Sequence, residues 1–170
     1  MTYKMQTRYC LKTNRTMKVV DVVVICISSP VLVGIYHNDE LIETIAKDEK
    51  VSDILPVLFE ELMAKYTVDS ATYTNSPGSF LGIKLTYIFL KTLSLTQDIK
   101  IYAMSGFHFN NNAPIKAYMG KYFIKQKDGK ITISDIPINE QTSEFTLPKI
   151  LNKTILSTDI DPIYVSPAVY

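Results

Sequence analysis

The residues with the most potential for chemistry lie in a glycine turn between two apolar segments. Residues 73–84 read Tyr-Thr-Asn-Ser-Pro-Gly-Ser-Phe-Leu-Gly-Ile-Lys. A glycine turn that leads into a helix can bind an anion, because free N–H groups and the helix dipole point at it. The spacing is not that of a P-loop, G-x-x-x-x-G-K-S/T, nor of a G-x-S-x-G nucleophile elbow. We therefore interpret it as a tight strand-to-helix connection built on these turn residues: Pro77, Gly78, Ser79, Phe80 and Gly82.

Each turn residue has a structural role that its chemistry predicts. Pro77 fixes its own φ, and Gly78 can take a positive φ at a sharp reversal. Ser79 is a good N-cap for a helix that begins at Phe80. Gly82, one turn into that helix, leaves room for a neighbouring backbone.

The other reactive side chains form no recognisable catalytic or metal-binding pattern. The two histidines, His37 and His108, are far apart in sequence, and no H-x-x-x-H occurs. The two cysteines, Cys10 and Cys26, form no C-x-x-C and imply no disulfide framework, which fits a reducing cytosol. We expect no catalytic residue, no metal and no cofactor, and a cytoplasmic location.

Length and charge limit the classes of protein to which the chain can belong. A chain of 170 residues with 46% apolar residues forms one domain or two unequal lobes, and no apolar run is long enough to span a membrane. Residues 1–18 carry five basic residues and no acid, including both arginines, while the remainder has 13 basic and 17 acidic residues. The remainder therefore has a charge of −4 and no arginine, which argues against a nucleic-acid surface there.

The basic segment at residues 1–18 has three interpretations. A helical face could contact RNA or an anionic membrane, or the segment could be a targeting sequence. We favour a disordered extension, with Met17 as a natural start, and expect a chain that begins there to melt at an unchanged temperature. The remaining chain divides into an N-terminal lobe at residues 19–106 and a reduced C-terminal lobe at residues 107–170.

The predicted elements follow the order β-β-β-α-β-α-β. Three β-branched strands form a meander, and turn and capping signals then separate two helices and two further strands. Ser52 or Asp53 is the predicted cap of the first helix. Asp128-Gly129 marks a hairpin, and residues 144–151 are predicted as a short helix. The predicted strands span residues 19–28, 31–36, 41–46, 69–74 and 99–104, and the helices span 52–65 and 80–95.

The helix predicted at residues 80–95 has apolar residues on nearly its whole circumference, with only Lys84 and Lys91 charged. A sheet covers one apolar face of a helix, so the second face must meet something else. The first helix shows a similar excess, in Phe59 and Met63. Charged substitutions at Phe59 on the first helix and Phe89 on the second should break both self-pairing and pairing with another protein. The predicted partner interface consists of Phe59, Leu62, Met63, Leu85, Phe89 and Leu93.

These motifs resemble the TsaB family, also called YeaZ. Residues 73–84 are similar to its Y/G-x-x-x-P-G-S-F-T-G-L/V-R signature, and residues 50–56 to its H-S-E-x-L-L-P helix start. The resemblance covers residues 17–107 well and the rest in fragments, such as residues 161–165. It implies an α/β fold, the actin-like ATPase (ASKHA, RNase H-like) lobe, with a truncated second lobe.

The sequence departs from the family pattern where the family's first strand usually ends I-D-T-S. Cys26 takes the place of that acid, which in active relatives of the fold helps to hold metal and phosphate. Between apolar neighbours, Cys26 is better explained as a small buried residue than as a ligand. In the signature itself, Leu81 replaces threonine and Lys84 replaces arginine. These departures predict that no nucleotide is bound.

The resemblance implies a non-catalytic partner subunit. Such a subunit pairs with the catalytic protein TsaD and, together with the ATPase TsaE, supports threonylcarbamoyl transfer to the tRNA adenosine next to the anticodon. We expect a homodimer when the chain is free, indirect contact with tRNA and no membrane contact. The alternatives are a small peptidase-like or acyl-transfer enzyme and an actin-like nucleotide-binding module.

Overall fold

The computed structural model describes residues 17–135 and 141–165. Only Met17 and Lys18 of the predicted basic extension fall within this range, so the expectation for that extension lies outside the described residues. Among the described residues, no helix has the length and hydrophobicity that crossing a membrane requires.

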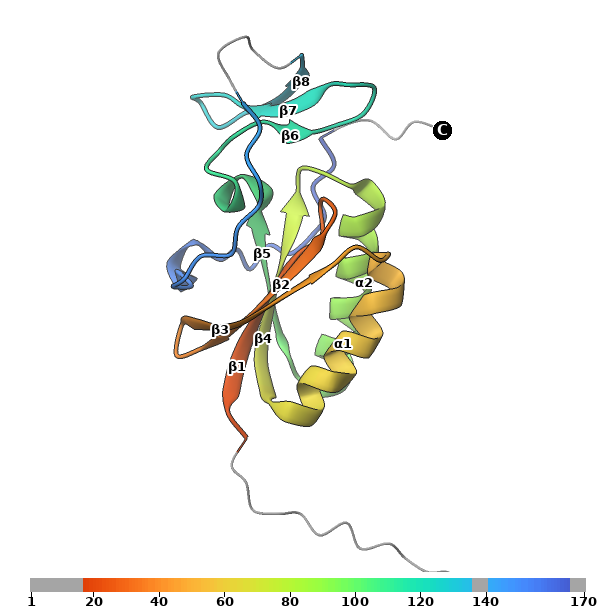
Figure 1. Cartoon of the computed structure of the whole chain (residues 1–170), viewed down its shortest axis with the longest axis vertical. Helices are drawn as coiled ribbons and strands as arrows, with labels where there is room; N and C mark the ends of the chain where they lie inside the picture. Colours follow the sequence, from red (N-terminus) through yellow and green to blue (C-terminus); the bar gives the residue numbers. More distant parts are fainter. Residues whose placement is uncertain (1–16, 136–140, 166–170) are drawn as a thin grey trace, which may run out of the picture.

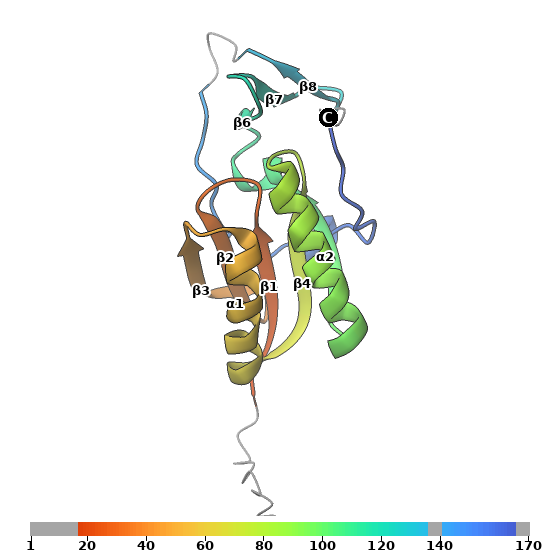
Figure 2. The ribbon, with the colours of Figure 1, turned by 90° about the vertical axis from the view of Figure 1, so that its right-hand side faces the viewer.

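A five-stranded sheet with two helices on one face forms the main part of the structure (Figure 1, Figure 2). The strand order is β3-β2-β1-β4-β5; β1, β2 and β3 pair antiparallel, whereas β4 pairs parallel to both β1 and β5. This arrangement confirms the predicted β-β-β-α-β-α-β order. The elements are β1 (Val19–Ile25), β2 (Val31–His37), β3 (Glu40–Lys47), α1 (Val51–Lys65), β4 (Thr67–Ser76), α2 (Phe80–Gln97) and β5 (Lys100–Ser105).

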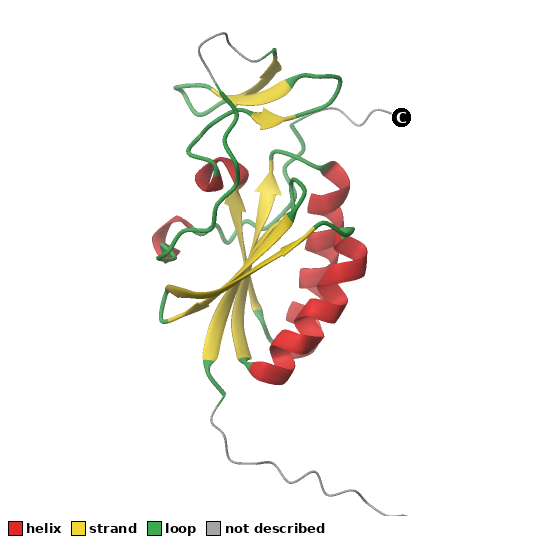
Figure 3. Ribbon diagram, viewed as in Figure 1, coloured by secondary structure: helices red, strands yellow, loops and turns green. Residues whose placement is uncertain are grey.

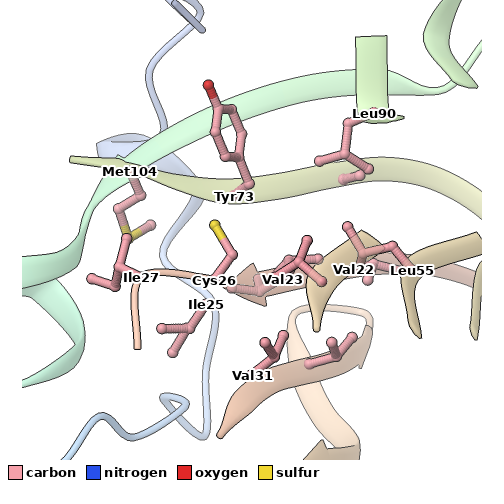
Figure 4. Close-up of a cluster of buried hydrophobic side chains, with 14 of the residues drawn as sticks. Val22, Val23, Ile25, Cys26, Ile27, Val31, Leu55, Tyr73, Leu90 and Met104 are labelled. Carbon is pink, nitrogen blue, oxygen red and sulfur yellow. The ribbon is translucent and has the colours of Figure 1, made fainter. Parts of the chain in front are cut away.

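The core forms because β1 is β-branched on both faces and lies in the middle of the sheet. Side chains alternate between the two faces of a strand. Val22 lies beside Leu55 of α1 and Leu90 of α2 (Figure 4), and all three are at most 1% exposed. Asp21 points to the opposite face, where its carboxylate accepts a hydrogen bond from Ser70.

Two local predictions were wrong at the element ends. Strand β1 ends at Ile25 rather than at Ser28, because the chain leaves the sheet before the Ser29-Pro30 bend. Helix α1 begins one residue early, with Lys50 at the N-cap position and no side-chain cap. The predicted cap Ser52 instead donates its hydroxyl to Asp53, at 2.9 Å.

A second, smaller sheet follows a short 3-10 helix, η1 (Gly106–Phe109). It has the order β6-β7-β8 and is antiparallel throughout. The turn at Asp128-Gly129 joins β7 to β8, with Gly129 at φ 86°, which confirms the predicted hairpin. The strands are β6 (Ile115–Lys116), β7 (Tyr122–Lys125) and β8 (Ile131–Ser134).

Residues 141–165 are extended apart from one short 3-10 turn, η2 (Lys153–Ile155), so the helix predicted at residues 144–151 is wrong (Figure 3). The extended backbone bridges both edge strands of the main sheet, which a helix could not do. Leu151 N–H donates to Asp39 beside β3, and Ser157 exchanges two 2.9 Å bonds with Ala103 of β5. We call residues 141–165 the C-terminal strap.

The strap is fixed to the sheet by an ion pair as well as by backbone bonds. Lys153 Nζ lies 2.7 Å from Asp21 Oδ2 and 2.8 Å from Asp39 Oδ1. Both carboxylates raise the pKa of Lys153 above its usual value. The strap thus neutralises Asp21, which is only 7% exposed.

Candidate functional site

The glycine turn joins β4 to α2 and rests on the end of β1. The backbone N–H of Ser79 donates to the carbonyl of Ile27, at 3.1 Å. The Ser79 hydroxyl accepts a hydrogen bond from Gly82 N–H at 3.2 Å, which confirms Ser79 as the N-cap of α2. The first turn of α2 is therefore tied to the segment that follows β1.

The two glycines of the turn are required by close packing. Gly78 has φ 147°, and a Cβ there would overlap the side chain of Ile27. A Cβ on Gly82 would overlap the carbonyl oxygen of Cys26. Both roles were predicted from the sequence, and they confirm the turn as a tight connection between a strand and a helix.

Cys26 lies beneath this turn and is 2% exposed. Its sulfur is 3.4 Å from the Thr74 hydroxyl and 3.5 Å from the Thr74 carbonyl, and it points toward β4 (Figure 4). Burial raises the pKa of the Cys26 thiol, which keeps it neutral. The predicted role of Cys26 as a small buried residue is confirmed.

A cavity of about 330 Å³ opens between the start of α1 and the start of α2. The free backbone N–H groups at the two helix N-termini and the ammonium of Lys50 could attract an anion there. The carboxylates of Asp48 and Glu49 also line the cavity and oppose that attraction. Hydroxyls on its wall come from Ser28, Ser29, Ser52 and Ser79.

The two histidines lie on separate parts of the structure. His37 ends β2, where its Nδ1 is 2.8 Å from the Val19 carbonyl oxygen. His108 belongs to η1, and burial together with the nearby Lys125 lowers its pKa. Neither histidine is part of the turn or of the cavity wall.

The predicted partner interface needs a correction on α1. Phe59 is 0% exposed and Leu62 is 3% exposed, so neither side chain is accessible to a partner. Phe59 packs edge to face against Phe89 of α2, with ring centroids 5.3 Å apart. Phe59, which we expected to meet another protein, instead joins the two helices, and Leu62 belongs to the core.

The other four predicted interface residues are partly buried. They pack against the core and leave only part of each side chain accessible: Met63, Leu85, Phe89 and Leu93. Leu85, Phe89 and Leu93 lie between the buried face of α2 and its outer face, and Met63 belongs to α1. Whether a partner contacts them stays a prediction.

A more exposed apolar stripe on α2 was missed. Leu81, Ile88 and Leu95 are 61%, 50% and 78% exposed, respectively. Each follows the last by seven residues, so all three lie on one side of the helix. Lys84 and Lys91 have the same seven-residue spacing, and this signal in the sequence could have located the outer face. We call Leu81, Ile88 and Leu95 the outer stripe.

The C-terminal strap extends this accessible apolar surface at the start of α2. The ring of Tyr164 lies 4.5 Å from that of Phe80, measured between centroids. Phe80 and Tyr164 are 49% and 44% exposed, respectively. The Tyr87 hydroxyl donates to Asp161 at 3.2 Å and holds the strap beside the helix.

Comparison with known proteins supports the predicted fold. No protein-family model matches the chain, and no curated protein matches it in sequence. The structure matches YeaZ from Pseudomonas aeruginosa with a TM-score of 0.54 and 14% sequence identity, over 68% of this chain and 64% of that one. A second solved protein, described as uncharacterized with similarity to peptidase YEAZ from Pseudomonas aeruginosa, matches with a TM-score of 0.48 and 15% identity, over 68% and 63% of the two chains. The chain thus spans just under two thirds of the YeaZ structure, and it has a YeaZ-like, actin-like α/β fold.

Proposed function

We propose that this chain is a non-catalytic partner subunit of a TsaD-like protein. In this role it supports the transfer of threonylcarbamoyl to the tRNA adenosine next to the anticodon, with a TsaE-like ATPase as a further component. The YeaZ-like fold supports the proposal, as does the resemblance of residues 73–84 to the TsaB signature.

The outer stripe is the observation that carries the proposal. Leu81 and Leu95 are 14 residues apart, so the stripe runs for about 21 Å along α2. Two lysines, Lys84 and Lys91, lie beside it. An apolar line with polar borders on an exposed helix is typical of a surface that binds another protein.

The free chain is expected to use the same surface for self-pairing. A homodimer would bury the outer stripe of both copies until the catalytic subunit replaces one of them. Sedimentation of the free chain should therefore show a dimer, and addition of the TsaD-like subunit should convert it to a heterodimer.

A non-catalytic role also agrees with the environment of Cys26. The family resemblance gives this position to an acid in active relatives of the fold, and here a buried neutral thiol occupies it. A thiol without charge offers little attraction for a metal ion or a phosphate. The alternatives, a peptidase-like or acyl-transfer enzyme and a nucleotide-binding module, gain no comparable support.

A reconstitution experiment tests the proposal. Threonylcarbamoyl transfer to tRNA would be measured with the TsaD-like and TsaE-like proteins of the same genome, with and without this chain. We expect modified tRNA only when this chain is present and none from this chain alone. Full transfer in its absence, or peptidase or acyl-transfer activity of the isolated chain, would contradict the proposed role.

A further inference from the structure

The small sheet is the basic part of the described chain. Residues 115–135 contain five lysines and two aspartates, a charge of +3. Residues 17–114, which include the main sheet and both helices, contain seven lysines and eleven acidic residues, a charge of −4. The net charge of the chain hid this separation. The acidic residues of residues 17–114 offset the lysines that lie together on the small sheet.

One face of the small sheet points away from the core. Ile115 and Phe123 belong to the core, and Ile131 and Ile133 pack against it. Because side chains alternate along a strand, the neighbours of these residues lie on the opposite face. The pairings of Tyr122 with Lys116 and with Ser134 place these three residues there, and Thr132 pairs with Ile124 on the same face. We call this the outer face of the small sheet.

Most lysines of this unit are available for a ligand. Only Lys121 forms an ion pair with a described carboxylate, at 2.9 Å from Asp135. Lys125 donates to Asn112 at 3.3 Å, beside the histidine whose pKa it helps to lower. Exposed lysines without ion pairs to described residues lie at both ends of the outer face: Lys116, Lys127 and Lys130.

Aromatic side chains accompany the lysines. Tyr118 lies in the turn between β6 and β7 and is 45% exposed, and Tyr122 on the outer face is partly exposed. Ile124, between Tyr122 and the next turn, is only 7% exposed. Apart from Met119, which is 90% exposed in the same turn as Tyr118, the accessible surface therefore consists of aromatic rings, hydroxyls and ammonium groups.

We infer that the outer face of the small sheet binds single-stranded nucleic acid. Ammonium groups at both ends attract successive phosphates, and tyrosine rings offer faces on which unpaired bases stack. Threonine and serine hydroxyls between them disfavour insertion into a bilayer, which calls for an apolar face. The binding is independent of sequence, because the unit has no arginine fork to read a base edge. This inference does not depend on the proposed partner.

The test compares three full-length variants that each lose four positive charges. The first carries Lys→Gln at the small sheet: Lys116, Lys125, Lys127 and Lys130. The second carries Lys→Gln on exposed sites of the main part: Lys47, Lys50, Lys84 and Lys91. The third replaces the basic residues near the N-terminus by Gln: Lys4, Arg8, Lys12 and Arg15. Fluorescence anisotropy would measure binding to 12-nucleotide RNA and DNA strands, and a light-scattering assay would measure binding to phosphatidylserine vesicles.

The wild-type chain is expected to bind both strands more tightly than a 12-base-pair duplex. Three phosphate contacts, one for each of Lys116, Lys127 and Lys130, predict that its association constant falls about 20-fold when salt rises from about 50 to about 200 mM. The small-sheet variant should lose most of this salt dependence and bind at least about 10-fold more weakly at low salt. The main-part variant should bind like the wild type.

Three results would overturn the inference. The small-sheet variant could bind as tightly as the wild type, or the N-terminal variant alone could abolish binding. The wild type could also bind the vesicles while binding neither strand. Circular dichroism on all variants ensures that lost binding reflects lost charge and not unfolding.

Discussion

The rings of Phe59 and Phe89 meet edge to face, with centroids 5.3 Å apart and planes inclined by 67°. This contact joins α1 to α2 across the line between the helices. Phe59 is fully buried, whereas Phe89 is partly accessible. The pair therefore stabilises the helical layer from within, and a partner can reach only the Phe89 side of it.

Truncation of Phe59 should destabilise the fold strongly. We expect Phe59→Ala to lower the free energy of unfolding by about 3–5 kcal/mol, because it leaves a cavity in the core. Phe89→Ala should have a smaller effect, since that ring is partly solvated. Urea unfolding followed by circular dichroism measures both changes. A charge at Phe59 should unfold the chain rather than break its association with a partner. A stable, folded Phe59→Asp would contradict the assignment of Phe59 to the core.

The close approach of Gly82 to Cys26 leads to a second prediction. Alanine has a higher helix propensity than glycine, by about 1 kcal/mol. The added Cβ would nevertheless overlap the Cys26 carbonyl, and relief of that overlap requires α2 to move away from β1. We expect Gly82→Ala to lower the free energy of unfolding by about 1–3 kcal/mol. A stabilised variant in the same urea assay would show that the turn has more space than the structure indicates.

The sequence predicted the order of the main elements because their signals are local. β-branched runs mark the strands, and Ser79 with its glycines marks the entry to α2. The burial of Phe59 could not be predicted in this way. A rotation of one residue turns a helix face by about 100°, and the packing of α1 on α2 decides which face is inside.

The C-terminal strap could not be predicted for a related reason. Its position depends on contacts with residues more than 100 positions earlier, such as Lys153 with Asp21 and Asp39. The local pattern at residues 144–151 favoured a helix, and pairing with the edge strands overrode that preference. Likewise, the overall charge of −4 after residue 18 gave no sign that lysines gather on the small sheet.

The ion pairs of Lys153 predict how the strap responds to substitution. In Lys153→Met, the nearly buried Asp21 would keep, among its contacts with described residues, the Ser70 hydrogen bond but lose its ion pair. We expect a loss of about 1–3 kcal/mol in the free energy of unfolding at neutral pH. Lys100→Met is the matched control, because the Lys100–Asp69 pair is exposed and should contribute less than about 1 kcal/mol. Equal effects of the two variants would contradict the anchoring role of Lys153.

The same ion pairs predict a dependence on pH. The folded protein raises the pKa of Lys153 above its ordinary value of 10.5, so folding favours the protonated ammonium. The resulting stabilisation is complete below pH 10.5 and is lost as the pH rises from there through the raised pKa. The difference between the wild type and Lys153→Met should therefore shrink in alkaline buffer. If the difference in the free energy of unfolding instead grows above pH 10.5, the stabilising role of the Lys153 ammonium is wrong.

The cavity at the helix N-termini should not bind a nucleotide. Asp48 and Glu49 line it and repel phosphates, and the neighbouring Cys26 offers no charged ligand for magnesium. Titration calorimetry of the isolated chain with ATP and magnesium is expected to show no saturable heat. Binding in the micromolar range would instead support the nucleotide-binding alternative.

The affinity for the TsaD-like subunit tests the central claim most directly. Titration calorimetry would compare the wild type with Ile88→Glu, a variant in which Lys84 and Lys91 should favour the new carboxylate on the helix. Met119→Glu is the control, because Met119 is 90% exposed but lies in the turn between β6 and β7, away from α2 in the sequence. We expect the wild type and the control to bind alike, and Ile88→Glu to bind at least about 30-fold more weakly, as a central contact residue would. Absence of wild-type binding, or equal binding by a folded Ile88→Glu, would contradict the account.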